Sequence, residues 1–305
     1  MTAVIGWGVL NLVLALFFGP LFEGFSRKYI KAQIAHSRQG PLVGVWQPFL
    51  DLLKLLGKED LEVGLTSWQR LAPVLCLGSA LCAALLVPLV KRPPLDMGGD
   101  VIVFIYVLGL SAIAIILGGM ATGTPYAYAG ATREMMMYLL VELALVMALV
   151  TAMVNAHSLR FADLIAWHTV HGASLSMLIA AFALFMALQA QFGKLPFDIP
   201  EAEQEIIGGP FIEMSGPKLA LFKWAIWVRQ FVLATVLVKV FFPWPHTALA
   251  GVNLILTLVK VLLVFVLIGL IEVVTPRLRI DQALQFYLWI VITGVMAVVL
   301  AFVAG

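Results

Sequence analysis

The sequence predicts an all-α integral membrane protein that crosses the bilayer with eight helices. Hydrophobic residues make up 62% of its 305 residues and charged residues only 12%, whereas a soluble domain carries roughly 25% charged residues. The mean hydropathy is +1.03. Because too few polar side chains are present to cover a water-facing surface, the bilayer must be the solvent. The net charge of +2 is small and scattered along the chain, which argues against a nucleic-acid partner.

Eight apolar stretches have the length that a helix needs to cross a bilayer, which is about 20 residues. The sequence between them contains no repeat, low-complexity tract or soluble domain, so residues 1–305 are interpreted as a single membrane domain. The first stretch lacks the basic start and the cleavage site of a signal peptide, and it is interpreted as a retained helix. The stretches are residues 4–22, 71–90, 100–119, 135–153, 173–192, 219–242, 248–272 and 284–303.

The distribution of basic residues predicts the orientation. Eleven Lys and Arg residues fall in the loops on one side of the membrane, against three in the loops on the other side. Cytoplasmic loops carry the excess of positive charge. The chain is therefore expected in the inner (cytoplasmic) membrane of the cell, with both termini external. The loops expected to be cytoplasmic are residues 23–67, 120–134, 193–218 and 273–283.

The first of these loops is predicted to contain a short amphipathic helix over residues 47–58. Pro48 suits its first turn and Gly57 its end. Such a helix lies at the membrane interface, either as a plain anchor or facing a partner or a cavity. Its polar face comprises Gln47, Asp51, Lys54 and Lys58, and its apolar face Phe49, Leu50, Leu53 and Leu56.

The third of these loops is unusually acidic for a face where positive charge is the rule. Pro200 is suited to start a helix, and some of the acids would then favour the helix dipole as ordinary first-turn residues. Five acids against Lys194 and Lys218 favour a functional loop, whose carboxylates are expected to repel one another and to titrate as one coupled group. The acids are Asp198, Glu201, Glu203, Glu205 and Glu213.

Ionisable residues also fall inside the predicted spans. A charge at the centre of a membrane helix costs roughly 2.5–3.5 kcal/mol, so such residues usually pair or line a water-filled path. Glu142, Arg229 and Lys260 lie deep in three different spans, where both interhelical ion pairs and a proton relay are open interpretations. Glu134 precedes Glu142 by eight residues, which places both on nearly one helix face. Lys239 and Glu272 lie near span ends and are expected to snorkel to the interface.

The cysteines and histidines give no metal-binding pattern. Cys76 and Cys82 lie in one apolar stretch without a Cys-x-x-Cys spacing. His157, His168 and His171 cluster between two spans, where a solvated loop is the favoured interpretation. The chain itself is therefore expected to hold no cofactor.

Three motifs lie on the side predicted to be cytoplasmic. They are Arg38–Pro41 with Gln47–Leu55, Gly130–Glu134 with Glu142, and Pro196–Glu205 with Glu213–Gly216. Together they resemble one family, the membrane subunit that respiratory complex I shares with energy-converting nickel–iron hydrogenases such as formate hydrogenlyase, and the resemblance covers essentially the whole chain. Gly193–Pro196 and Gly209–Pro210 resemble the hydrogenase branch, while Met214 and Leu143 depart from the usual pattern.

The resemblance implies a division of labour in which the redox chemistry belongs to other subunits. Hydrogenase large and small subunits and iron–sulfur subunits, carrying the nickel–iron and iron–sulfur centres, would dock on the cytoplasmic face. Protonation changes would pass through the acidic loop to antiporter-like membrane subunits. This chain would supply docking residues Arg38, Asp51, Lys54 and Arg133, and a proton path of Glu134, Glu142, Arg229 and Lys260.

Two alternatives remain from other classes. The first is the quinone-binding subunit of complex I itself. The second is a stand-alone secondary transporter, which would be expected to show broken helices or internal repeats around a site at the middle of the membrane. Neither feature is visible in the sequence.

The predicted orientation can be tested at the end of the chain. With Cys76 and Cys82 changed to serine, a Gly305→Cys variant should react with a membrane-impermeant thiol reagent added to right-side-out vesicles, because positive charge holds the opposite face in the cytoplasm. Labelling that occurs only in inverted vesicles would show that the orientation is wrong.

Overall fold

The computed structural model describes residues 2–31, 44–61, 67–90, 93–247 and 249–304, and the regular elements in these ranges are all helices. Each predicted span coincides with one long helix. Seven of the helices are long and apolar enough to cross a membrane, and the eighth, α8, has 17 residues. At 1.5 Å per residue, α8 is about 26 Å long and reaches the lower limit for a span. The eight are α1 (Thr2–Phe25), α4 (Ser67–Leu86), α5 (Asp100–Met120), α6 (Pro125–Ala156), α8 (Leu175–Gln191), α10 (Gly216–Val236), α11 (Ala250–Val274) and α12 (Ile280–Ala304).

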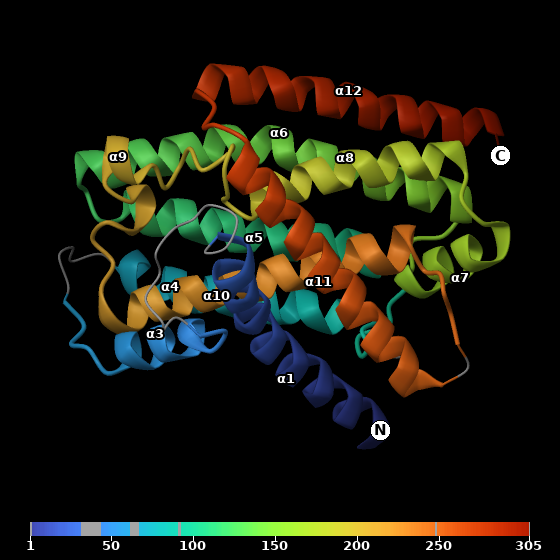
Figure 1. Ribbon diagram of the computed structural model, residues 1–305, viewed down its shortest axis with the longest axis horizontal. Coiled ribbons are helices and arrows are strands. Elements are labelled where there is room, and N and C mark those ends of the chain that lie inside the picture. The colour runs from blue at the N-terminus through green and yellow to red at the C-terminus, as the bar shows by residue number, and fades with distance from the viewer. Residues whose placement is uncertain (1, 32–43, 62–66, 91–92, 248, 305) are drawn as a thin grey trace.

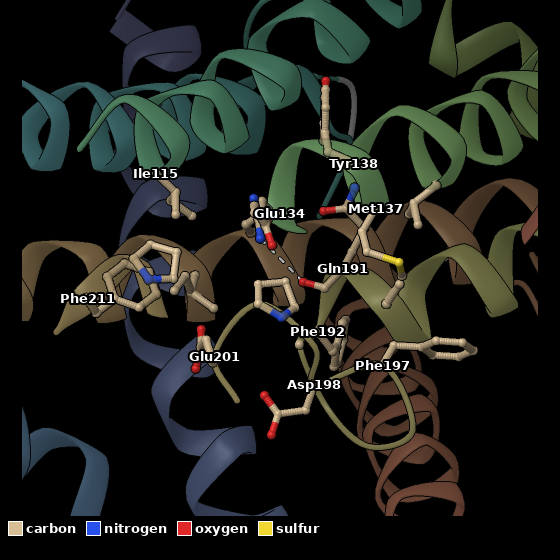
Figure 2. A pocket seen from close by; sticks show the side chains of 17 residues that line it. Ile115, Glu134, Met137, Tyr138, Gln191, Phe192, Phe197, Asp198, Glu201 and Phe211 are labelled. Atoms are coloured by element: carbon tan, nitrogen blue, oxygen red, sulfur yellow. Dashed lines mark hydrogen bonds between the residues drawn. The ribbon is translucent and has the colours of Figure 1, made fainter. Parts of the chain in front are cut away.

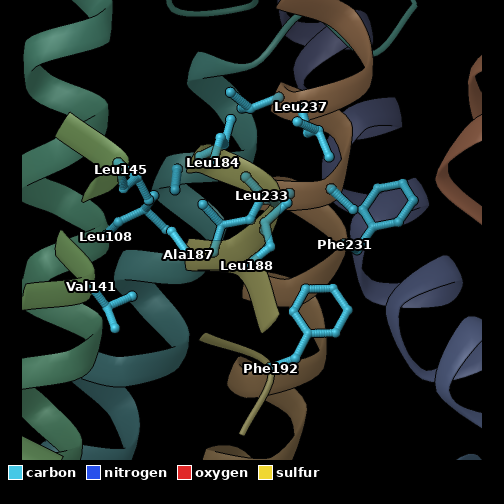
Figure 3. Packing of buried hydrophobic residues seen from close by; sticks show 14 of the residues in the cluster. Leu108, Val141, Leu145, Leu184, Ala187, Leu188, Phe192, Phe231, Leu233 and Leu237 are labelled. Atoms are coloured by element: carbon cyan, nitrogen blue, oxygen red, sulfur yellow. The ribbon is translucent and has the colours of Figure 1, made fainter. Parts of the chain in front are cut away.

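The helices form a bundle around α10. Figure 1 shows α6, α8 and α12 side by side, with α4, α5 and α10 beneath them and α1 and α11 crossing the bundle obliquely. Helix α10 is almost entirely buried, whereas α11 and α12 expose most of their surface to the surrounding membrane. Leucine and phenylalanine side chains of α5, α6, α8 and α10 meet in the core (Figure 3). Lipid is as apolar as these side chains, so close packing holds the helices together.

The remaining elements are short. Two π-helical turns extend the spans, η1 (Ser26–Lys31) after α1 and η3 (Leu237–Phe241) after α10. Helix α9 (Glu203–Ile206) and the 3₁₀ turn η2 (Gly209–Phe211) belong to residues 193–215, here named the acidic segment. The acidic segment and α3 (Gln47–Leu56) lie at one end of the bundle, here named the loop face, and α7 (Phe161–His171) lies at the other, the terminal face (Figure 1).

Helix α3 confirms the predicted amphipathic helix, with Pro48 in its first turn and Gly57 at its end. The side chains distribute differently from the expectation. Leu52 is buried against Ala220 and Trp227 of α10, whereas Leu50 and Leu53 of the predicted apolar face are 56% and 67% exposed. The helix therefore packs on α10 with one edge and presents apolar side chains outward.

Two expectations about local structure were wrong. Helix α6 begins at Pro125, ten residues before the predicted span, because the polar side chains around Arg133 lie on a helix that continues beyond the hydrocarbon region. His168 is buried on α7 instead of lying in a solvated loop, and its Nδ1 donates a 2.7 Å hydrogen bond to the carbonyl oxygen of Val240. Burial lowers the pKa of His168.

Because Gly130 has no side chain, the acidic segment can lie directly against α6. A Cβ at Gly130 would approach the Gly209 Cα to 2.6 Å. Gly209 itself has φ of +56°, which other residues rarely adopt. The close approach of α6 and the acidic segment at this point therefore requires glycine at both positions.

Gly130→Ala should lower the melting temperature of the detergent-solubilised protein, since overpacking costs about 1–3 kcal/mol. The matched control is Gly78→Ala in α4, where a Cβ meets no atom within 4 Å. That control should be neutral or stabilising by about 0.5–1 kcal/mol, because alanine favours a helix. Equal melting temperatures for the two variants would show that the contact is not tight.

Candidate functional site

A small cavity lies inside the bundle where α6, α8 and α10 meet the acidic segment (Figure 2). Its volume is about 40 Å³, which is room for at least one water molecule. We name it the acidic cavity. Four charged side chains line it together with Tyr138 and apolar residues: Glu134 from α6, Arg229 from α10, and Asp198 and Glu201 from the acidic segment.

Arg229 supplies the fixed positive charge of this cavity. Its side chain is buried, and its Nη2 donates to the backbone oxygen of Gln191 at 3.4 Å. Among the described residues its Nε and Nη1 have no hydrogen-bond partner. A guanidinium carries five N–H donors and does not lose its proton in a protein. The unpaired donors of Arg229 therefore favour water and carboxylates as its neighbours in the cavity.

Three residues of α6 form a row of polar side chains that begins at the acidic cavity and continues along the helix. Glu134, Tyr138 and Glu142 are spaced four residues apart and share one helix face. Tyr138 and Glu142 form a hydrogen bond, and both carboxylates interact electrostatically with Arg229. Sequence reasoning missed Tyr138, although its position midway between two glutamates was a usable signal. The row leads from the loop face into the membrane-spanning part of α6.

Glu201 is the titratable group of the acidic segment that responds near neutral pH. Burial raises the pKa of Glu201 to about 7, and repulsion from Asp198 and Glu134 adds to the increase. Attraction to Lys223 and Arg229 opposes it. Glu201 can therefore change its protonation state near neutral pH.

The acids of the acidic segment whose side chains the structure describes do not gather in one group, contrary to the expectation. Asp198 and Glu201 line the acidic cavity, but Glu205 is exposed and forms a 2.6 Å ion pair with Arg133. That ion pair lowers the pKa of Glu205. Glu213 does not line the cavity. The side chain of Glu203 lies outside the described residues.

A second, larger cavity of about 540 Å³ opens beside the first, and Asp198 and Glu201 line both. Its wall contains a buried ion pair in which the Lys194 Nζ lies 2.7 Å from the Glu23 Oε2. Arg27 joins the same carboxylate, with its Nε 3.0 Å from the Glu23 Oε1. Sequence reasoning did not single out Glu23 because its partner Lys194 follows far along the chain. We name this space the outer cavity, since it leads toward the loop face.

Three of the predicted docking residues, Asp51, Lys54 and Arg133, lie on the loop face. The Asp51 Oδ2 is 3.7 Å from the Arg27 Nη1, and the Gln47 amide donates to Asp51 at 3.0 Å. Lys54 is exposed on α3. Arg38 lies outside the described residues. Asp51 thus links α3 to the ion pairs that line the outer cavity.

Lys260 does not join the other residues of the predicted proton path. Its ammonium lies toward the terminal face, where it donates to the backbone oxygens of Phe242 at 2.9 Å and Trp244 at 2.5 Å. The side chain therefore reaches the end of η3 despite its depth in the sequence of α11. The structure brings together Glu134, Glu142 and Arg229, and leaves Lys260 apart.

Comparisons with known proteins agree with this architecture. Hydrogenase-4 component C of Escherichia coli (strain K12) is 37% identical, over 88% of this chain and 86% of the relative. Formate hydrogenlyase subunit 4 of the same organism is 34% identical, over 86% of this chain and 87% of the relative.

A solved structure shares the fold. One chain of the membrane-bound sulfane sulfur reductase, an archaeal respiratory membrane complex, matches with a TM-score of 0.85 and 29% identity, over 98% of this chain and 99% of that chain. The NADH dehydrogenase family matches residues 7–304. With its multi-pass helical bundle and its charged cavity at the loop face, the chain belongs to the NADH dehydrogenase family.

Proposed function

We propose that this chain is the membrane-anchoring and proton-path subunit of a membrane-bound nickel–iron hydrogenase complex. It would couple redox chemistry in peripheral subunits to the translocation of protons or sodium ions. The observation that carries the proposal is the row of carboxylates that runs from Glu201 through Glu134 to Glu142 beside the buried Arg229. The similarity to hydrogenase-4 component C and formate hydrogenlyase subunit 4 supports the assignment to a hydrogenase.

The coupling step follows from the position and pKa of Glu201. A pKa of about 7 allows a small change in nearby charge to load or release its proton. An added electron in a docked subunit would favour the protonated acid. The proton would then pass through cavity water to the Glu134 carboxylate and along the Tyr138–Glu142 hydrogen bond. Arg229 would stabilise each carboxylate after its proton leaves.

The loop face is the proposed docking surface for the peripheral large, small and iron–sulfur subunits. The exposed apolar residues of α3, Lys54 and the Arg133–Glu205 ion pair are available there. Nickel–iron and iron–sulfur centres would belong to those partners, and antiporter-like membrane subunits would receive the protonation change. That this chain holds no cofactor of its own stays a prediction.

A quinone-binding role, as in complex I, is the second candidate, favoured by the size of the outer cavity. At about 540 Å³, it falls within the usual volume of small-molecule sites, roughly 300–1,000 Å³. Binding of a quinone analogue to the purified complex, with loss of binding in Trp227→Ala, would favour it over the hydrogenase role. The similarity to components of multisubunit complexes gives no support to a stand-alone transporter.

Glu201→Gln should leave the complex assembled and its electron transfer active, while ion translocation falls about ten-fold or more. The substitution keeps the shape of the side chain and removes the titratable proton. The matched control is Glu205→Gln in the same segment, which is exposed and outside the acidic cavity. It should retain translocation, and its effect should be a salt-sensitive weakening of docking.

Infrared titration gives a second measurement. The wild-type protein should show a carboxylic acid signal that is lost as the pH rises through about 7, and the difference between the wild-type and Glu201→Gln spectra should contain that component. Because the charge of Asp198 raises the pKa of Glu201, Asp198→Asn should move this transition to lower pH. A fully coupled Glu201→Gln complex would contradict the proposal.

Glu142→Gln distinguishes a relay from a structural ion pair. A relay predicts normal assembly with impaired ion translocation, and Tyr138→Phe should reproduce a weaker form of the same defect because it removes only the hydrogen bond. A purely structural role predicts loss of assembly and a lower melting temperature for Glu142→Gln. Normal assembly with normal coupling would exclude both roles.

A further inference from the structure

A cavity of about 310 Å³ lies near the terminal face, on the side of η3 and α11. It is bounded by η3, the loop that follows it, the first turns of α11, the segment after α4, and one residue of α7. We name it the cationic cavity. Its lining includes Lys239, His246, Asn253, Thr257 and Lys260, and no Asp or Glu among the described residues.

Its two lysines lack a counter-charge in the part of the chain that the structure describes. Lys260 donates to two backbone oxygens, which carry no formal charge. Lys239 is half-buried, and it forms no hydrogen bond or ion pair with the described residues. Both side chains line the same cavity, where their like charges repel. Charges inside a membrane protein usually pair, so we expect this cavity to bind an anion from outside the chain.

An apolar groove of about 480 Å³ continues from the cationic cavity along the bundle. It runs between α8, η3 and α11, and shares Val238, Phe242 and Lys260 with the cationic cavity. Leu178, Phe182 and Leu263 expose their side chains along it. The groove faces the hydrocarbon region, since α11 is packed loosely against the bundle and most of its surface is open to the membrane. A positive end joined to an apolar channel is complementary to one kind of molecule, an amphiphile with an anionic head.

We propose that the cationic cavity and the groove together bind one anionic phospholipid of the bilayer. The phosphate of its headgroup would lie between Lys239 and Lys260, and an acyl chain would fill the groove against Leu178, Phe182 and Leu263. Basic pockets between membrane helices are suited to such headgroups. The bound lipid would neutralise two cations that otherwise repel each other. It would also fill the space between α8 and α11 that no side chain of the described residues fills.

The test uses the full-length chain purified in its complex and titrated with phosphatidylglycerol, with binding followed by native mass spectrometry. Phosphatidylcholine and inorganic phosphate serve as comparison ligands. Removing one lysine near the headgroup should weaken binding roughly five-fold. Lys239→Met should therefore bind phosphatidylglycerol about five-fold more weakly, and the double variant with Lys260→Met about 25-fold more weakly. Lys28→Met on η1 at the loop face is the matched control and should bind as the wild type does.

A second pair of variants tests the groove. Leu263→Trp places a larger side chain in the groove and should weaken lipid binding without changing charge. Leu288→Trp on α12 is similarly exposed but lies outside the groove, and it should have no effect. Because Lys239 makes no bond to the described residues, Lys239→Met should fold normally even where Lys260→Met does not.

Three results would overturn the proposal. The first is unchanged phosphatidylglycerol affinity in Lys239→Met. The second is equally tight binding of inorganic phosphate, which would identify a free anion site without a lipid. The third is a photo-crosslink from position 263 to a helix of another subunit in the assembled complex, which would identify that helix as the occupant of the groove.

Discussion

The position of Arg229 in the middle of the bundle constrains much of the surrounding structure. A guanidinium does not lose its proton, so its charge has to be accommodated inside α10, which is almost entirely buried. The chain does this in two ways. The last residue of α8 turns a backbone oxygen toward Arg229, and α6 places Glu134 and Glu142 on the face nearest to it. The small cavity between them has room for water beside the donors that remain. The charge is thus accommodated within a helix that packs mainly against α4 and α1.

The acidic segment is subject to a second constraint, because it is irregular backbone that lies close to the membrane. Such backbone is tolerated where protein buries it or where it lines a water-filled space. Three side chains supply the missing hydrogen bonds. Gln230 of α10 donates to the Phe192 oxygen at 3.0 Å, and Gln189 of α8 donates to the Leu195 oxygen at 2.9 Å. Arg277 donates to the backbone oxygen of Asp198 from the connection between α11 and α12. The segment is thus held by α8, by α10 and by the connection between α11 and α12, and its carboxylates are positioned with it.

The sequence was sufficient for the features that depend on local pattern. Apolar runs of bilayer length predicted the eight helices, and the periodicity of residues 47–58 predicted α3. The polar face of α6 was also readable, since Glu134 and Glu142 are related by helical spacing. Helix boundaries were harder where polar residues continue a helix beyond the hydrocarbon, as at Arg133. The motifs that resemble the family pointed to the right class because they lie at the acidic segment and α6, where the charged groups converge.

The missed features depend on contacts between residues distant in the sequence. No local sequence pattern indicates that Lys194 pairs with Glu23. Likewise, no local pattern indicates that Glu205 points outward to Arg133 while Asp198 and Glu201 point inward. Lys260 looked too deep to reach the interface, yet a long flexible side chain extends to the end of η3. His168 looked like a loop residue because α7 is too short to stand out. Each of these features depends on how the helices pack against one another, which cannot be read from a single sequence.

The size of the acidic cavity also bears on which particles could follow the proposed path. A space of about 40 Å³ holds few water molecules, so a metal cation entering it would have to give up most of its hydration shell next to the permanent charge of Arg229. A proton that binds a carboxylate moves as part of a neutral acid and meets no such barrier. On the proposed path, positive charge would therefore advance past Arg229 by exchange between acids, and a sodium ion moved by the complex would cross the membrane through another subunit.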